Sequence, residues 1–421
     1  MHHDRSMIDR RGLLKSAACT SAALATGLGA PSILRAQSDV LRIGHLTPLT
    51  GFLGPLGEYA VMGITLAVEE LNAAGGVQGR RLELLSEDSV NPSTASSKAQ
   101  RMIERDGVAC IVGEISSASG LAIAEVAGRN QRLFINTGCN SDALRGSSCN
   151  RFMFHVEAAN SMYVKSCGQA LLREGMVQGK KWFSLTADYA FGHDLFRVAD
   201  RFVQQNGGEF VANELVPTDA ADFSPYILKV RQVQPDLVVS NLAGNQITNF
   251  VKQYREYQLP FPIAGFGYDT AAAWGAGADA MQGTTWPCIW YHTIQTPSSQ
   301  AFTRAFTQRW GKPPENQAWG DYNAMKILAH AMAETGKTDS GALLEHLEKG
   351  AKFDVMKQRE GYFRAWDHQL IMEMYTMTPK PAAQAQDKWD IMTIGEPVPG
   401  PSEDLEIIAP SKEENACTFA A

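Results

Sequence analysis

Residues 108–140 read VACIVGEISSASGLAIAEVAGRNQRLFINTGCN and contain the pattern that decides the fold. The apolar run Val108–Val112 is too short for a helix and rich in β-branched residues, which predicts a buried strand. A polar turn and a helical pattern follow, and a second short strand, 133–135, ends in another polar turn, 136–140. This order predicts a parallel sheet that binds its ligand at the carboxyl ends of the strands.

The first polar turn contains Ser116 and Ser117, which are predicted to lie at the start of the helix. The free backbone N–H groups and the positive dipole end of a helix suit a carboxylate. A serine there also serves simply as an N-cap, so one serine alone does not separate the two roles. Three serines within four positions, facing a second polar turn, keep an anion site open as the alternative.

Length and composition indicate a two-domain soluble protein. A chain of 421 residues is too long for one ordinary core. With 44% hydrophobic and 20% charged residues, the composition is that of a globular protein. Residues 1–36 contribute five basic and two acidic groups, so the remainder carries 33 basic and 43 acidic side chains, a net charge of −10. This acidity argues against nucleic acid or an anionic membrane as the partner.

The N-terminus is predicted to be a Tat-type signal peptide spanning residues 1–36. A twin-arginine pattern around Arg10 and Arg11 precedes an apolar, alanine-rich stretch, Ser16–Ala30, and a small residue, Ala36, at a cleavage position. We therefore expect the mature protein in the periplasm. No later run of about 18 apolar residues suggests a membrane span.

The cysteines of the remaining chain show no metal-binding spacing. No C-x-x-C or Cys/His cluster occurs, so we expect no metal site. In an oxidising compartment Cys139 and Cys149, ten residues apart, are candidates for a disulfide that closes a small loop. The alternative is that the cysteines on apolar elements are buried thiols.

Strand and helix patterns alternate in two similar series. The first begins at Val40 and the second at Lys181, which predicts two α/β lobes, each with a parallel sheet flanked by helices. Later, 361–364 and 370–377 read as the two strands of a hairpin. The segment after Pro379 is rich in Pro, Gln and Glu and is predicted to be loosely ordered, apart from a short apolar patch around Trp389 to Ile394.

Catalytic signatures are missing from the sequence. It contains no G-x-S-x-G elbow, Walker A loop, H-E-x-x-H pair or EF-hand loop, and nothing pairs a nucleophile with a base. We therefore expect no cofactor, and a binding protein rather than an enzyme.

From about Val40 to Met377 the chain resembles the periplasmic solute-binding proteins of ABC importers related to the leucine/isoleucine/valine-binding protein. The resemblance rests on ordered signatures: Ile43-Gly44 to Leu49-Thr50-Gly51, Asn72-Ala73-Ala74-Gly75-Gly76, Val112-Gly113 with Ser116-Ser117, Ile135-Asn136-Thr137-Gly138, and Asp188-Tyr189-Ala190-Phe191-Gly192. It implies a type I periplasmic binding fold of two Rossmann-like lobes joined by three crossings. The implied boundaries are 38–157 plus 288–355 for the first lobe, 158–287 plus 356–395 for the second, and 396–421 for the tail.

The resemblance also implies the residues that hold the ligand. The two first-lobe turns would grip the carboxylate and ammonium of an amino acid, through Ser116, Ser117, Thr137, Cys139 and Asn140. Tyr189 and Phe191 would close from the second lobe, and Leu56 would lie over the ligand side chain.

One position departs from the amino-acid-binding relatives. They hold the ammonium with an acidic residue just after the strand predicted at 262–265, where this chain has Gly267 or Tyr268, with Asp269 one or two residues later. A buried ammonium without a carboxylate partner would cost several kcal/mol. Either Asp269 turns into the pocket, or the ligand is an aromatic or other organic acid without an ammonium group. A third reading makes Asp269 only the cap of the next helix.

The sequence therefore predicts a monomeric transport receptor that closes around a small carboxylate ligand and docks on an ABC permease of the inner membrane. The alternatives are a ligand-sensing subunit for a membrane regulator and, less favoured, an exported two-lobe enzyme.

Overall fold

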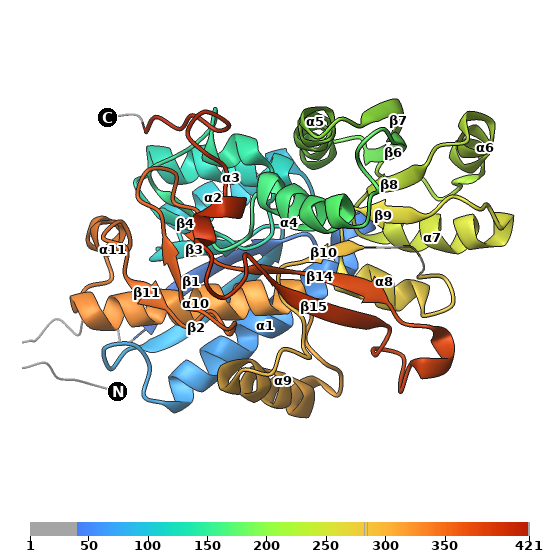
Figure 1. Ribbon diagram of the computed structural model, residues 1–421. Coiled ribbons are helices and arrows are strands. Elements are labelled where there is room, and N and C mark those ends of the chain that lie inside the picture. The colour runs from blue at the N-terminus through green and yellow to red at the C-terminus, as the bar shows by residue number, and fades with distance from the viewer. Residues whose placement is uncertain (1–39, 282, 284, 420–421) are drawn as a thin grey trace, which may run out of the picture. The chain divides into compact units, whose positions relative to one another are not determined.

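The computed structural model describes residues 40–281, 283 and 285–419. The predicted signal peptide, residues 1–36, lies outside the described residues, so the export pathway stays a prediction. The described part of the chain forms two parallel sheets and two smaller antiparallel ones (Figure 1).

The first lobe is formed on a five-stranded parallel sheet of order β2-β1-β3-β4-β5. Helices pack on both of its faces, so its central strand is buried throughout and carries no charged side chain. The elements are β1 (Val40–Thr47), η1 (Gly51–Leu53), α1 (Gly54–Ala73), β2 (Arg81–Asp88), α2 (Pro92–Glu104), β3 (Cys110–Gly113), α3 (Ser117–Arg129), β4 (Leu133–Asn136), η2 (Asp142–Arg145) and β5 (Met153–His155).

The second lobe repeats this plan on a four-stranded parallel sheet of order β7-β6-β8-β9. In Figure 1 it runs from green to yellow, apart from the blue and cyan first sheet. Its elements are α4 (Asn160–Arg173), β6 (Lys181–Ala187), α5 (Ala190–Gln205), β7 (Glu209–Val216), α6 (Ser224–Val233), β8 (Leu237–Asn241), α7 (Asn245–Tyr257), β9 (Ile263–Gly265) and α8 (Thr270–Ala276). The two-lobed parallel α/β fold predicted from the alternating pattern is therefore confirmed. The exact lobe boundaries remain a prediction.

The rest of the chain adds three helices and the two antiparallel sheets, β10-β14-β15 and β11-β12-β13. The predicted hairpin is confirmed by the antiparallel pairing of β12 with β13. These elements are β10 (Trp286–Cys288), α9 (Pro297–Trp310), α10 (Asn316–Thr335), α11 (Ser340–Leu347), β11 (Lys352–Phe353), β12 (Gly361–Phe363), β13 (Leu370–Ile371), β14 (Met374–Pro379), η3 (Ala382–Gln384), β15 (Met392–Val398) and η4 (Leu405–Ile408).

Helix α10 returns to the first lobe and packs against α1. A Cβ atom added to Gly63 of α1 would lie 2.2 Å from the carbonyl oxygen of Ala318, so the two helix backbones are in direct contact. Together with η1, α1 (Gly51–Ala73) is long and apolar enough to span a membrane by length and composition. Its contact with α10 inside the lobe explains that composition, because the helix supplies core residues.

Two predictions about the cysteines and the tail are wrong. Cys149 forms its disulfide with Cys417 and not with Cys139. The Cys139 thiol is buried beneath α3, where it donates to the carbonyl oxygens of Glu114 and Ser116 at 3.3 and 3.4 Å. The tail is not loosely ordered: β15 pairs with β14, Ile408 is buried in the core, and the disulfide ties the end of the tail to the first lobe.

Candidate functional site

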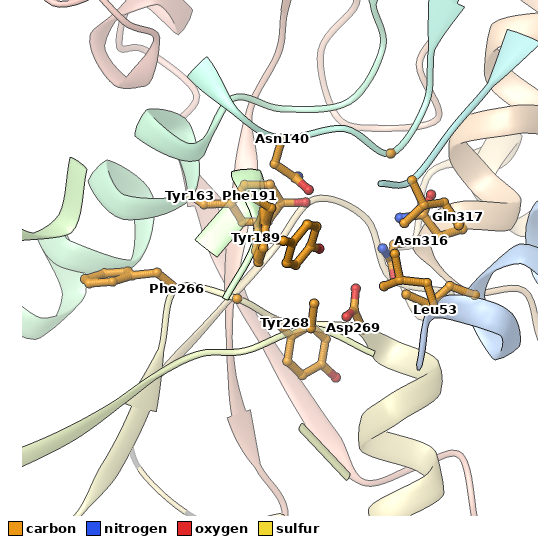
Figure 2. A pocket seen from close by; sticks show the side chains of 15 residues that line it. Leu53, Asn140, Tyr163, Tyr189, Phe191, Phe266, Tyr268, Asp269, Asn316 and Gln317 are labelled. Atoms are coloured by element: carbon orange, nitrogen blue, oxygen red, sulfur yellow. The ribbon is translucent and has the colours of Figure 1, made fainter. Parts of the chain in front are cut away.

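A small, largely enclosed cavity lies where the carboxyl ends of the two parallel sheets meet (Figure 2). Both lobes contribute to its wall, through Leu53, Leu56, Ile115, Gly138, Asn140, Tyr163, Tyr189, Phe191, Ala243, Phe266, Gly267, Tyr268, Asp269, Asn316 and Gln317.

Apolar side chains from both lobes meet at one side of the cavity. Leu53, Leu56 and Ile115 of the first lobe belong to the same buried cluster as Phe191 and Phe266 of the second. The loop after β1 delivers the two leucines to this position, because η1 runs directly into α1. A ligand seated here would exchange water for hydrocarbon on at least one of its sides.

Aromatic residues of the second lobe also line the cavity. Tyr189 lies where β6 ends and α5 begins, and its ring packs edge-on against Phe52 of the first lobe, with 5.5 Å between centroids. The Tyr189 ring also lies 5.7 Å from that of Phe191. Figure 2 shows the Tyr268 hydroxyl pointing away from the other labelled side chains, so this residue contributes mainly the base of its side chain to the wall.

Asp269 supplies the acidic group of the cavity. Its Oδ2 accepts a hydrogen bond from the backbone N–H of Gly244 at 2.6 Å, and burial raises the pKa of its carboxyl to about 6. Figure 2 shows the carboxylate between Tyr189 and Asn316. Asp269 is the N-cap residue of α8 by position, but its side chain makes no capping bond to the helix.

The cavity wall holds no cationic side chain to balance this carboxylate. None of the described residues that line it is Lys, Arg or His. The remaining polar groups are neutral: the amides of Asn140, Asn316 and Gln317 and the tyrosine hydroxyls. A buried carboxylate without a charged partner is costly, so the site has an electrostatic demand for a cation.

The N-terminus of α10 brings two amides into the site. Glu315 caps this helix, because its Oε1 accepts hydrogen bonds from the N–H groups of Gln317 and Ala318 at 2.8 and 3.0 Å. Burial raises the pKa of the Glu315 carboxyl to about 8. The Oδ1 of Asn316 accepts from the N–H of Thr270 at 3.3 Å, which is a direct bond between the lobes. The first turn of α10 is thereby fixed against α8.

Six of the residues predicted from the sequence are brought together at the cavity: Leu56, Asn140, Tyr189, Phe191, Tyr268 and Asp269. Among the residues that sequence reasoning missed are Tyr163, Asn316 and Gln317. A signal for the last two was present, since three polar residues at 315–317 stand directly ahead of an apolar helical pattern. Nothing comparable marks Tyr163, which lies in the first turn of α4.

The other four predicted residues, Ser116, Ser117, Thr137 and Cys139, are not among those that line the cavity. The Oγ of Ser117 accepts a hydrogen bond from the N–H of Ser141 at 3.3 Å, and the side chain is fully buried. The structure therefore gives this serine a bond that joins the two turns.

The N–H groups just before α3 are also occupied by the protein itself. Oε1 of Glu114 accepts from the backbone N–H groups of Ile115 and Ser116, at 3.0 and 2.8 Å. Glu114 adopts a left-handed backbone conformation, φ 70°, which is uncommon for a residue other than glycine. Burial raises the pKa of its carboxyl to about 7. An internal carboxylate thus occupies part of the region where we predicted that of a ligand.

Comparisons with known proteins agree with this architecture. The family model described as periplasmic binding protein matches residues 40–385. The Leu/Ile/Val-binding protein homolog 7 of Brucella melitensis is 27% identical over 357 residues, which cover 77% of this chain and 88% of the relative.

Two solved structures resemble the chain along nearly all of their length. A periplasmic binding protein from Burkholderia mallei has a TM-score of 0.83 and 27% identity, covering 90% of this chain and 99% of that one. A branched-chain amino acid ABC transporter periplasmic ligand-binding protein from Burkholderia xenovorans has a TM-score of 0.77 and 26% identity, with the same coverage. With its family model, fold and two-lobed cavity in agreement, the chain belongs to the type I periplasmic binding proteins of ABC transporters.

Proposed function

We propose that the protein is the ligand-capturing receptor of an ABC importer and that its ligand is a small hydrophobic amino acid. The proposal rests on one observation above all: the interlobe cavity contains a buried carboxylate, Asp269, and no cationic side chain among its described lining residues. A ligand with an ammonium group supplies the missing charge. Leu53, Leu56 and Phe191 provide an apolar surface for its side chain.

Ligand capture would shift the protein toward the closed form. A ligand that touches Asn140 of the first lobe and Asp269 of the second binds the closed arrangement better than the open one, and so increases its population. The closed receptor then delivers the ligand to a membrane permease. Curated relatives that are named as amino-acid-binding protein homologues, and a solved relative named as a component of a branched-chain amino acid transporter, support this role.

The second ligand class is a simple organic acid, such as benzoate, which carries no ammonium. Its carboxylate would have to lie near Asp269 without a lysine or arginine to balance the two charges. Two carboxylates in one site force one of them to take up a proton. The cavity therefore favours an amino acid over an unsubstituted acid.

The test is a thermal-shift screen with leucine, isoleucine, valine, phenylalanine and benzoate, followed by calorimetry on any compound that raises the melting temperature. We expect an amino acid to give the largest shift, and Asp269→Asn to weaken its binding at least about 30-fold, because the ammonium loses a buried charged partner. Tyr226→Ala, in the second lobe but outside the cavity wall, should leave affinity unchanged. A shift with benzoate alone, or an unchanged affinity in Asp269→Asn, would reject the amino-acid assignment.

Two rival functions, an exported enzyme and a sensory subunit, can be distinguished from a transport receptor by further measurements. An exported enzyme would return its ligand chemically altered, whereas a receptor releases it unchanged, as mass spectrometry of the bound and released compound would show. A sensory subunit would bind the same ligand but would not stimulate the ATPase activity of a reconstituted permease complex.

A further inference from the structure

Arg145, the last residue of η2, has a fully buried side chain outside the cavity wall. Its guanidinium makes four hydrogen bonds, and their acceptors are neutral: the backbone carbonyl oxygens of Cys139, Ser141 and Glu157, and the Oε1 of Gln369. The distances are 2.7 Å to three of these acceptors and 3.0 Å to Ser141. Arginine can reach several acceptors at once because its donors form a planar fork.

Two of the acceptors flank a residue of the cavity wall. Cys139 and Ser141 stand on either side of Asn140, whose amide lines the cavity. One nitrogen of Arg145, Nη1, binds both carbonyls, at 2.7 and 3.0 Å. Rotation of either flanking peptide would break one of these bonds. Arg145 therefore fixes the backbone direction from which the Asn140 side chain projects.

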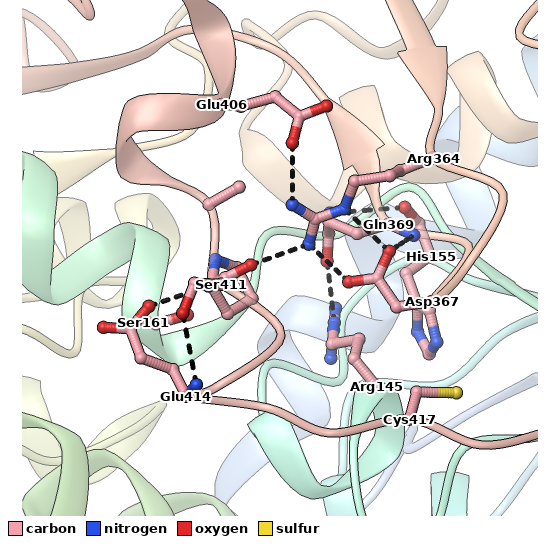
Figure 3. Close-up of polar contacts among 12 residues, drawn as sticks. Arg145, His155, Ser161, Arg364, Asp367, Gln369, Glu406, Ser411, Glu414 and Cys417 are labelled. Carbon is pink, nitrogen blue, oxygen red and sulfur yellow. Dashed lines mark hydrogen bonds and ion pairs between the residues drawn. The ribbon is translucent and has the colours of Figure 1, made fainter.

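Of the other two acceptors, one lies on a connection between the lobes and one lies on a hairpin. Glu157 is in the segment that joins β5 of the first lobe to α4 of the second. Gln369 lies in the turn between β12 and β13, on the hairpin that leads into β14, and β14 packs against α4. Figure 3 shows Arg145 directly below Gln369. Gln369 also donates to the Glu157 carbonyl at 3.0 Å, so the connection, the hairpin and Arg145 form one network.

The segment that contains Glu157 and joins β5 to α4 also makes hydrogen bonds to residues of the cavity wall. Tyr163, which lines the cavity, donates its hydroxyl proton to Oε1 of Glu157 at 2.9 Å. On the loop side, the N–H of Asn160 donates to the carbonyl oxygen of Asn140 at 2.8 Å. The cavity wall thus contacts the first interlobe connection at two places, and Arg145 binds both the connection and the loop.

We propose that Arg145 is a positioning residue for the ligand site. It does not touch the ligand; it aligns Asn140 and ties the loop of Asn140 to the first connection between the lobes and to the hairpin that leads into β14. Changes in the loop on ligand binding are thereby transmitted to the segments that must bend when the lobes close. This inference rests on the proposed receptor function only in the experiment that measures ligand affinity; the hydrogen-exchange experiment does not depend on it.

The experiment uses the full chain and three single variants. Arg145→Lys keeps the charge but cannot span four acceptors. Gln369→Met removes one acceptor and leaves the guanidinium in place. This variant tests the same network if Arg145→Lys does not fold. Arg364→Lys is the matched control, because Arg364 is also a buried arginine, held by Asp367 and the tail, and its side chain makes no hydrogen bond to the loop of Asn140 among the described residues.

The first measurement needs no ligand. Hydrogen exchange of the ligand-free protein should be faster in residues 137–146 and 156–160 of both Arg145→Lys and Gln369→Met than in the wild type. Arg364→Lys should leave these two segments unchanged even if its global stability falls by as much. Equal exchange in the wild type and both test variants would overturn the inference, whatever the ligand proves to be.

The second measurement is a double-mutant cycle with Asn140→Ala, using leucine as the probe. If Arg145 acts through Asn140, Arg145→Lys should weaken leucine binding about tenfold in the wild-type background and have little effect when Asn140 is already alanine. Arg364→Lys combined with Asn140→Ala should show additive effects. Additive losses for Arg145→Lys would overturn the inference. Absence of leucine binding in the wild type would count against the proposed function, while the exchange result would still decide the role of Arg145.

Discussion

The backbone N–H of Asp142, in the first lobe, donates a hydrogen bond to the carboxylate of Asp194 on α5 of the second lobe, at 2.7 Å. Two carboxyl groups therefore face one another across the contact between the lobes. Burial, and then the charge of Asp194, raise the pKa of the Asp142 carboxyl to about 6. Arg197 holds the other oxygen of Asp194 at 2.6 Å, so the proton is more easily taken up by Asp142.

The first prediction concerns stability and pH. A carboxyl whose pKa is higher in the folded than in the unfolded state stabilises the fold fully below about pH 4, and this contribution is lost as the pH rises through about 6. Asp142→Asn should make the decline shallower than in the wild type, because an amide keeps the acceptor for the N–H of Ser161 without the charge. The other buried carboxyls with a raised pKa, Glu114, Asp269 and Glu315, still contribute to the decline. Thermal melts between pH 4 and 7.5 measure it. Asp219→Asn, at an exposed position, is the control, and a parallel decline in both variants would exclude Asp142 as the cause.

The second prediction concerns ligand binding and pH. The Asp269 carboxyl has a raised pKa of about 6 in the free protein, and pairing with an ammonium group would lower it. Amino-acid affinity should therefore be constant above about pH 7 and fall about tenfold for each pH unit below about 6. Calorimetry at several pH values measures this. The Glu315 carboxyl, with its raised pKa of about 8, lies near Asp269, so Glu315→Gln is needed to show that the slope belongs to Asp269.

The third prediction concerns the disulfide between Cys149 and Cys417, whose partners are 268 residues apart. Cys417→Ser should lower the free energy of unfolding by about 2–5 kcal/mol, because the cross-link no longer restricts the unfolded chain. Denaturant unfolding with and without reductant provides the control within one experiment. Reduced wild-type protein should match Cys417→Ser, and the variant itself should not respond to reductant.

The fourth prediction compares two glycines in helices. Alanine at position 63 would place its Cβ 2.2 Å from the carbonyl oxygen of Ala318, and so would push α1 away from α10. We expect Gly63→Ala to lower the free energy of unfolding by about 1–3 kcal/mol. Gly275→Ala, in α8, meets its nearest atom, the Thr248 hydroxyl oxygen, at an ordinary 3.4 Å. It should be neutral or raise stability by up to about 1 kcal/mol, because alanine favours a helix over glycine.

Much of the fold could be predicted because its signals are local. The strand predicted at 108–112 is found at Cys110–Gly113, and the helix after it begins at Ser117 as expected from the serines. The polar turn after β4, which contains Asn140, could be placed at the ligand site because the carboxyl ends of parallel strands share one edge of a sheet. Asp269 was a candidate only through the family resemblance, with its role left open.

Features that depend on distant segments were not predictable in the same way. The bonding of Glu114 to the N–H groups before α3 requires a left-handed residue, for which the sequence gives no glycine as a warning. Cys139 is nearer to Cys149 in the sequence, but its side chain is turned inward beneath Gly120. The contact is so close that a Cβ atom added to Gly120 would lie 2.5 Å from the Sγ of Cys139. Pairing with Cys417 depends on how the tail crosses the first lobe, and that follows from tertiary structure alone.

The position of Cys417 in the sequence also limits when the disulfide with Cys149 can form during synthesis and folding. During translation it leaves the ribosome 268 residues after Cys149, so the cross-link can form only once all the residues between the two cysteines have been made. By then the other cysteines of the described chain, Cys110, Cys139, Cys167 and Cys288, can already have been enclosed by packing. Early burial would shield these thiols from mispairing, and a correct cross-link would then need no isomerase to sort it from wrong ones.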